Sequence, residues 1–276
     1  MQFPPSPQSG SIASAGTDDL RAEYLAQDLF ANGECRLRYW ETDRTIVGGI
    51  IPGATPIDLP CPEGLKSLYF LERREAGIVN LGGPGRISVA GKPQAMAHLD
   101  ALYLGRGVEK VSFSSDSVAE PSRFWLLSYP AHAAHPSRHV DFAGSQGAKL
   151  GTPEGANQRS LHKLIHPGSM PTCQVVMGVT RLASGSVWNT MPPHTHLRRS
   201  EVYLYFDVRP GAAVFHFMGA PQETRSLVVR DFEAVLVPPW SVHCGVGTAN
   251  YSFVWGMGGE NQEFADMDPA PVDSLR

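Results

Sequence analysis

The sequence has little net charge and no long apolar run. Its 276 residues include 23 Lys and Arg against 27 Asp and Glu, which gives a formal net charge of −4. No broad basic surface for nucleic acid is therefore expected. The sequence contains no stretch of about 18 apolar residues, so no membrane-spanning helix is expected. The N-terminal residues lack the basic start and apolar core of a signal peptide, so no such peptide is expected.

Cysteine is scarce, and the cysteines are far apart without a C-x-x-C pair. This spacing argues against both a zinc knuckle and a disulfide scaffold. The simplest interpretation is four thiols in a reducing cytoplasm. The four are Cys35, Cys61, Cys173 and Cys244.

Short apolar runs separated by Gly and Pro dominate the chain from Cys35 onward. Their regular spacing is typical of an all-β sandwich or barrel. Before them we expect a loose Pro/Ser/Gly-rich arm and one short amphipathic helix over residues 17–31. The β pattern breaks over residues 131–170 and resumes near residue 174. The predicted strands before the break are 45–47, 67–71, 77–81 and 86–89, and the predicted division is an arm and helix at 1–34, a barrel at 35–140, a linker at 141–172 and a second barrel at 173–276.

A weak internal repeat indicates that the two barrels are similar. Residues 73–78 echo 198–203, and residues 100–105 echo 231–238. When Ala101 is laid on Ala234, Lys110 falls where His243 stands, and no H-x-H precedes Arg73. Only the second barrel is then expected to hold a metal. Chance similarity between short β segments is the alternative.

The most informative segment is a histidine pair followed by a glutamate. His194 and His196 are two residues apart, which is the period of a strand, so both imidazoles can leave one face together. Glu201 follows five residues later, and His243 ends a downstream P-x3-H. Three imidazoles and a carboxylate suit a borderline divalent ion such as Zn, Mn, Fe, Ni or Cu. We therefore predict a metal site at these four residues.

The pattern H-x-H-x4-E with a distant P-x3-H resembles the cupin superfamily. Two features depart from it: Ser241 stands where glycine is frequent, and no asparagine lies four residues after His243. Longer segments resemble the 5-keto-4-deoxyuronate isomerases of pectin and hexuronate breakdown. These segments are 46–50, 70–75, 100–103, 187–196, 222–225, 245–248 and 255–262.

The resemblance implies an all-β bicupin of two jelly-roll barrels with a short N-terminal helix. It implies one Zn²⁺ at His194, His196, Glu201 and His243, and a homo-hexamer acting on a small sugar acid. The implied ketol-isomerase converts 5-dehydro-4-deoxy-D-glucuronate into 3-deoxy-D-glycero-2,5-hexodiulosonate. In this reaction the carbonyl of the substrate moves from C1 to C2, either by proton transfer through an enediol or by a hydride shift.

Proton transfer requires a base within hydrogen-bond reach of the C2 proton. Glu201 could serve if it leaves the metal. Tyr203 and Tyr205 share its strand face by period-two alternation, so their phenols are candidates, although either could be a packing tyrosine. His216 is more simply a core or surface histidine than a ligand.

The substrate carboxylate requires a cation, ideally a bidentate arginine. The candidates are Arg159, Lys163, Arg198 and Arg225. Two other functions fit a cupin: a metal dioxygenase using the same ligands, and a non-catalytic ligand-binding bicupin.

Overall fold

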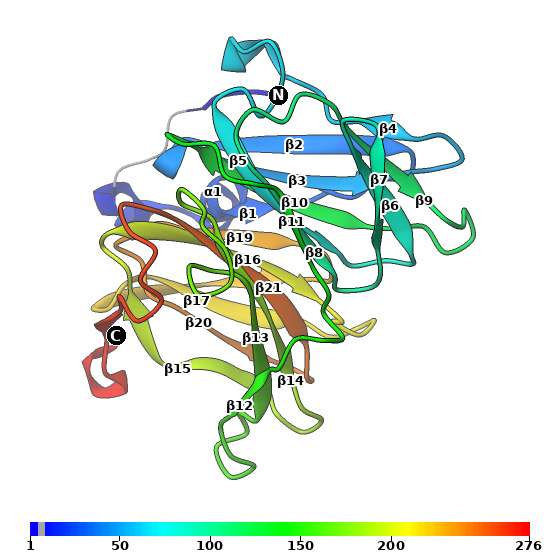
Figure 1. The fold of residues 1–276 in the computed structure, drawn as a ribbon. Coiled ribbons are helices and arrows are strands. Elements are labelled where there is room, and N and C mark those ends of the chain that lie inside the picture. The colour runs from blue at the N-terminus through cyan, green and yellow to red at the C-terminus, as the bar shows by residue number, and fades with distance from the viewer. Residues whose placement is uncertain (5–8) are drawn as a thin grey trace. The chain divides into compact units, whose positions relative to one another are not determined.

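The computed structural model describes residues 1–4 and 9–276, and the chain divides into two compact units. The first contains Asp28–Ser145 and Leu164–Met177. The second contains Gln146–Lys163 and Gly178–Arg276, together with the segment that ends at Gln27. No helix in the described part of the chain is long and apolar enough to cross a membrane. The chain is mostly β-strand, as predicted (Figure 1).

The first unit is built from two antiparallel sheets. The larger has the order β11-β8-β5-β10-β3-β2, and the smaller has the order β4-β9-β6-β7. The elements are β2 (Glu34–Trp40), η2 (Thr42–Arg44), β3 (Thr45–Ile51), β4 (Ile57–Asp58), η3 (Glu63–Leu65), β5 (Arg74–Asn80), β6 (Gly85–Val89), β7 (Lys92–Met96), β8 (Ala101–Leu104), β9 (Val111–Ser115), β10 (Phe124–Pro130) and β11 (Arg138–Val140).

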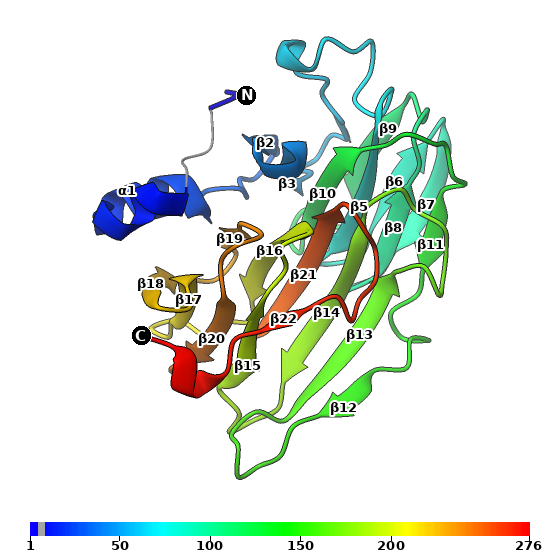
Figure 2. The same ribbon diagram turned by 90° about the vertical axis from the view of Figure 1, so that its left-hand side faces the viewer.

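The second unit also has two sheets, with orders β1-β19-β16-β21-β14-β13-β12 and β18-β17-β20-β15-β22, and two residues each of β13 and β14 belong to the first unit. Figure 2 shows β16, β21, β14, β13 and β12 as successive neighbours. The elements are η1 (Ser9–Ser14), α1 (Thr17–Tyr24), β1 (Leu25–Ala26), β12 (Ala148–Leu150), β13 (Arg159–Ile165), β14 (Val176–Leu182), β15 (Trp188–Thr195), β16 (Arg199–Phe206), β17 (Val214–Ala220), β18 (Glu223–Val229), β19 (Ala234–Val237), β20 (His243–Gly247), β21 (Ser252–Gly259), β22 (Asp268–Pro269) and η4 (Val272–Ser274).

The two units repeat one strand order. The run β8-β5-β10-β3 corresponds to β19-β16-β21-β14, and β7-β6-β9-β4 corresponds to β18-β17-β20-β15. The register agrees as well, because Ala76 pairs with Leu104 as Glu201 pairs with Val237. The repeat seen in the sequence is therefore a structural repeat, and Ala76 occupies the position of Glu201.

Apolar side chains fill the space between the two sheets of the first unit. Ala76 and Ile78 of β5 and Leu104 of β8 reach this cluster from the larger sheet. Phe113 of β9 reaches it from the smaller sheet. Burial of such side chains is the main favourable term in folding. The first unit thus has an apolar core at the position where the second unit has its predicted metal ligands.

Three sequence-based boundaries differ from the structure. The helix ends at Tyr24 instead of residue 31, because Leu25 and Ala26 pair with β19 as a short edge strand. Residues 67–71 form turns instead of a strand, and Leu68 is 87% exposed. The predicted linker 141–172 contains β12 and β13, whose pairing was hidden by the surrounding Gly, Pro and His. The predicted loose arm includes residues 5–8, which lie outside the described residues.

Candidate active site

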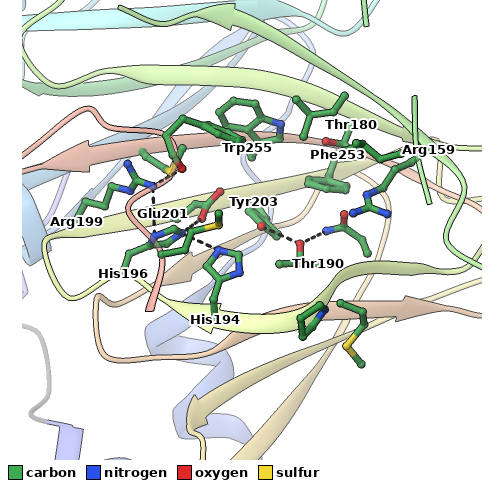
Figure 3. A pocket seen from close by; sticks show the side chains of 18 residues that line it. Arg159, Thr180, Thr190, His194, His196, Arg199, Glu201, Tyr203, Phe253 and Trp255 are labelled. Carbon is green, nitrogen blue, oxygen red and sulfur yellow. Dashed lines mark hydrogen bonds and ion pairs between the residues drawn. The ribbon is translucent and has the colours of Figure 1, made fainter. Parts of the chain in front are cut away.

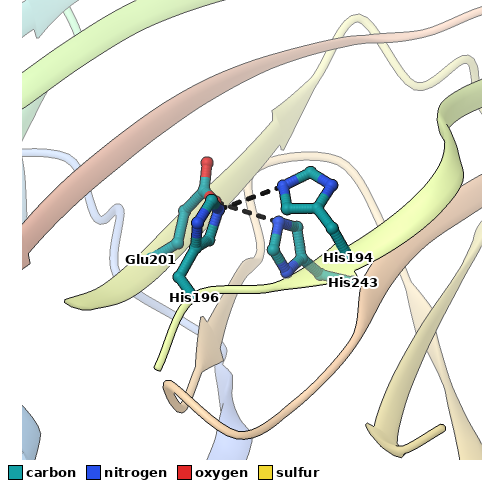
Figure 4. Close-up of side chains that lie close together, drawn as sticks. All are labelled: His194, His196, Glu201 and His243. Carbon is teal, nitrogen blue, oxygen red and sulfur yellow. Dashed lines mark hydrogen bonds and ion pairs between the residues drawn. The ribbon is translucent and has the colours of Figure 1, made fainter. Parts of the chain in front are cut away.

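The four predicted ligands converge in the second unit (Figure 4). One donor atom from each of His194, His196, Glu201 and His243 lies within 4.8 Å of all the others. His194 is on β15, Glu201 on β16 and His243 on β20, while His196 follows the end of β15. Because β16 belongs to one sheet and β15 and β20 to the other, the ligands meet between the sheets.

Strand pairing brings two of the imidazoles together. His194 lies directly opposite His243 across β15 and β20, and their ring centroids are 4.4 Å apart. The register of β15 shifts between Asn189 and His194. Thr190, inside this irregular stretch, has φ 55°, a left-handed conformation that is unfavourable for a β-branched residue. Such strain is often found at functional sites.

The hydrogen bonds of His196 fix its tautomer. Its Nδ1 lies 2.7 Å from the backbone oxygen of Asp266, so Nδ1–H donates to that carbonyl. The Arg199 guanidinium, 3.3 Å from the same nitrogen, can only donate and therefore does not hydrogen-bond to it. The Nε2 lone pair is left facing Glu201 Oε2 at 3.2 Å and His194 Nε2 at 3.0 Å. This orientation is the one that a metal-binding histidine requires.

His243 gives the most direct indication that an ion belongs here. Its side chain is fully buried, and neither ring nitrogen has a hydrogen-bond partner among the described residues. Its Nε2 nonetheless lies 3.1 Å from Glu201 Oε2. A buried nitrogen without a partner is costly. A divalent cation between these atoms would satisfy the nitrogen and the carboxylate together, so the residues present fit a metal.

The electrostatics keep the donors ready to bind a cation. Burial, with the nearby imidazoles of His243 and His196, lowers the pKa of His194 to about 2, so this ring is neutral. Burial opposes charge on Glu201, but the imidazole of His243 beside its Oε2 outweighs this effect and holds the pKa of this carboxyl well below its usual range. Neutral imidazole and ionised carboxylate are the forms that bind metal.

Three of the four ligands line a cavity of about 240 Å³ within the second unit (Figure 3). Its size suits a small molecule. Polar and apolar side chains share its walls. Besides His194, His196 and Glu201, the lining includes Arg159, Thr180, Asn189, Thr190, Arg199, Tyr203, Phe253, Trp255, Met257, Phe264 and Met267.

The two candidate tyrosines have different positions. Tyr203 lines the cavity, and its hydroxyl lies 3.3 Å from Thr190 Oγ1. Tyr205 does not line the cavity; its hydroxyl lies 2.7 Å from His216 Nδ1, and both side chains are fully buried. The two tyrosines share a strand face, as predicted, but Tyr205 lies two residues further along β16 and does not reach the cavity. His216 is a core histidine, as expected.

Only Arg159 of the four candidate cations lines this cavity. Arg198 forms ion pairs with Asp266 and Asp268, at 2.6 and 2.7 Å. Lys163 places its ammonium 3.8 Å from the ring centroid of Phe264, outside the lining. Arg225 lies on β18, 3.7 Å from Glu223, and faces a different hollow. The sequence could not distinguish these cations because all four lie in polar stretches.

Sequence reasoning missed Arg199 and the segment it holds. Arg199 is 1% exposed and donates to the backbone oxygens of Glu263, Phe264 and Asp266. We call residues 260–267 the strap. Its Phe264 and Met267 line the cavity, and its Asp266 carbonyl orients His196. The available signal was an arginine at the start of a strand whose second half, residues 202–206, is apolar or aromatic.

The chain is similar in sequence to known proteins over nearly its whole length. A model described as the KduI/IolB family matches residues 25–271. The chain is 51% identical over 268 residues to the 4-deoxy-L-threo-5-hexosulose-uronate ketol-isomerase of Kineococcus radiotolerans, covering 96% of each. It is 46% identical over 278 residues to the protein of the same name from Yersinia pseudotuberculosis, covering 100% of each.

Two solved structures share the fold at low sequence identity. An IolB-like protein from Salmonella typhimurium matches with a TM-score of 0.69 and 15% identity, over 87% of this chain and 94% of that one. A mutant of Bacillus subtilis oxalate decarboxylase matches with a TM-score of 0.60 and 9% identity, over 89% and 79%. These matches confirm the cupin-type all-β fold. With a family model that spans most of its length and relatives near half identity, the chain belongs to the KduI/IolB family.

Proposed function

We propose that this protein is a metal-dependent ketol-isomerase that converts 5-dehydro-4-deoxy-D-glucuronate into 3-deoxy-D-glycero-2,5-hexodiulosonate. The observation that carries the proposal is the four-donor cluster beside a small cavity, in which neither buried nitrogen of His243 has a hydrogen-bond partner among the described residues. The names of the relatives supply the reaction class and the substrate. Similarity of fold alone would not identify the reaction or the substrate, since one fold hosts many chemistries.

The reaction moves a carbonyl from C1 to C2 of the sugar acid. A proton leaves C2, negative charge develops on the C1 and C2 oxygens, the hydroxyl proton of C2 passes to the C1 oxygen, and a proton returns at C1. A divalent ion, which we propose is zinc, would be held by His194, His196, Glu201 and His243 and would stabilise that charge as a Lewis acid.

Within the chain itself, Glu201 is the residue we assign to the proton transfer. Both imidazole contacts, from His196 and His243, are made by its Oε2. Its Oε1 is thereby left to take the proton from C2 and return it at C1. Tyr203 lines the same cavity two residues along β16, so its hydroxyl can donate to a substrate oxygen. Phe253, Trp255 and Phe264 limit the access of water to the reacting carbons.

The test is a coupled assay of the purified protein on the product of unsaturated digalacturonate cleavage, with and without a chelator. We expect conversion that is lost on chelation, restored by added metal and unaccompanied by oxygen uptake. Running it in D₂O separates the two routes: a protein base exchanges the migrating hydrogen with solvent, whereas a hydride shift retains it. No conversion by the metal-loaded protein would overturn the function, and oxygen uptake would favour a dioxygenase.

We further propose that the protein acts in the cytoplasm in pectin-derived hexuronate breakdown, and that it assembles as a homo-hexamer. The four free cysteines are compatible with a reducing compartment. Light scattering tests the assembly, with a mass of six 29.9 kDa chains expected. A monomeric mass at working concentration would contradict it.

A further inference from the structure

Arg159 carries an unusual combination of position and partners. It is the first residue of β13, it is half-buried, and it lines the cavity. Its Nη1 donates to the backbone oxygen of Asn157 at 2.8 Å. Among the described residues no carboxylate lies within ion-pair distance of it. Burial lowers the pKa of its guanidinium, yet arginine remains charged in proteins. A partly desolvated cation at a cavity wall is stabilised by an anion within that cavity.

The cavity therefore has two chemically different ends. Figure 3 shows His196 and Arg199 toward one side and Arg159 toward the other, with Tyr203 and Thr190 between them. Arg199 is not available to a ligand in the same way, because its guanidinium donates to three backbone oxygens of the strap. One end presents the metal ligands, and the other presents an arginine fork.

The proposed substrate has matching ends. C1 and C2, where the hydrogen moves, lie at one terminus of the six-carbon chain, and the C6 carboxylate lies at the other. We propose that Arg159 binds this carboxylate, directs C1 and C2 toward Glu201, and selects uronates over neutral sugars of the same length. This inference rests on the proposed function, and it adds to that function the residue that sets its specificity.

A neighbouring hollow of about 420 Å³ supplies a matched control. Arg159 and Arg181 both line it, but Arg181 does not line the cavity of the metal ligands. Arg181 is exposed and lies 4.0 Å from Asp207. Replacing either arginine by glutamine removes one positive charge from the same region, but only Arg159→Gln removes the fork at the cavity.

The experiment compares wild type, Arg159→Gln, Arg159→Lys and Arg181→Gln on two substrates. One is the uronate, and the other is its neutral analogue, in which C6 is a hydroxymethyl group. A charge-assisted hydrogen bond contributes about 1.5–3 kcal/mol, so kcat/KM of Arg159→Gln on the uronate should fall about 10- to 100-fold. Its kcat/KM on the analogue should stay within about twofold. Arg159→Lys should be intermediate, because lysine keeps the charge but not the fork. Arg181→Gln should match wild type.

Metal content and the melting temperature, measured on each variant, identify any loss that comes from the ligands or from folding. Equal kcat/KM of the wild type on the uronate and the analogue would overturn the proposal without any variant. An unchanged preference in Arg159→Gln, or equal losses in Arg159→Gln and Arg181→Gln, would also overturn it. If the wild type does not convert the uronate, the proposed function fails instead.

Discussion

Glu201 combines two roles in a single residue, since its Oε2 faces two imidazoles and its Oε1 is assigned to the substrate proton. Replacing it by glutamine preserves its size and removes its charge. We expect the metal content per chain to fall and activity to drop by about 10²–10⁴-fold, the usual contribution of a positioned base. Elemental analysis and the coupled assay measure both quantities. Glu223→Gln on β18, whose side chain is 51% exposed, is the control that should change neither. Undiminished activity in the Glu201 variant would contradict the mechanism.

Cys35 allows a prediction at high pH that is independent of the metal site. It packs against the apolar cluster of the first unit, and burial raises the pKa of its thiol to about 12. The folded state holds this proton more tightly than the unfolded chain does. Its stabilising effect is therefore complete below pH 9, the ordinary pKa of the thiol, and is lost as the pH rises towards 12.

Native protein at pH 8 should accordingly react only slowly with iodoacetamide at Cys35, because the thiolate is the nucleophile. Mass spectrometry of the labelled protein, native and unfolded, measures this difference. A Cys35→Ala variant should lose less unfolding free energy between pH 8 and pH 10 than the wild type. Labelling of native Cys35 as fast as in the unfolded chain would refute the prediction.

Among the structural elements, the strap depends on Arg199 for its position. Arg199→Lys would keep a positive charge but could not reach the same three backbone oxygens with one ammonium group. The strap should loosen and the Asp266 carbonyl should no longer fix His196. Loss of such a supporting hydrogen bond typically weakens metal binding by about 10- to 100-fold. Competition with a chromogenic chelator measures this change. Arg198→Lys alters the part-buried side-chain ion pairs at Asp266 and Asp268 but leaves the bonds from Arg199 to the backbone oxygens of the strap, so as the matched control it should have a smaller effect.

Periodicity predicted the strands that carry the ligands but not the segment that covers them. His194 and His196 could be placed on one face because side chains alternate along a strand. The strap has no such repeat: Asp266 contributes its backbone oxygen, which any residue could supply, and Arg199 reaches the strap through long-range contacts. The strand β13 was missed for a related reason, since Gly, Pro and His surround it and its neighbour on one side, β12, is only three residues long.

For the whole molecule, the repeat predicts one ion per chain. Ala76 stands in the register of Glu201, and the surrounding positions of the first unit are apolar. Lys110, just before β9, corresponds to His243 at the start of β20. Elemental analysis should give one equivalent of metal, and His194→Ala combined with His243→Ala should remove it. Anomalous scattering from a second ion near Glu75 or Lys110 would contradict this.

The repeated strand order also sets how freely each half of the chain can change. In the first unit, Ile78 and its neighbours need only fill a volume, so swaps among apolar side chains of similar size should usually be tolerated. In the second unit, Tyr203 occupies the position that corresponds to Ile78. Its hydroxyl lies beside that of Thr190, so this position depends on the placement of individual atoms and not only on the volume filled. Random mutagenesis with selection for growth on hexuronate should therefore yield a permissive N-terminal core and an almost invariant C-terminal one, although the two barrels share one architecture.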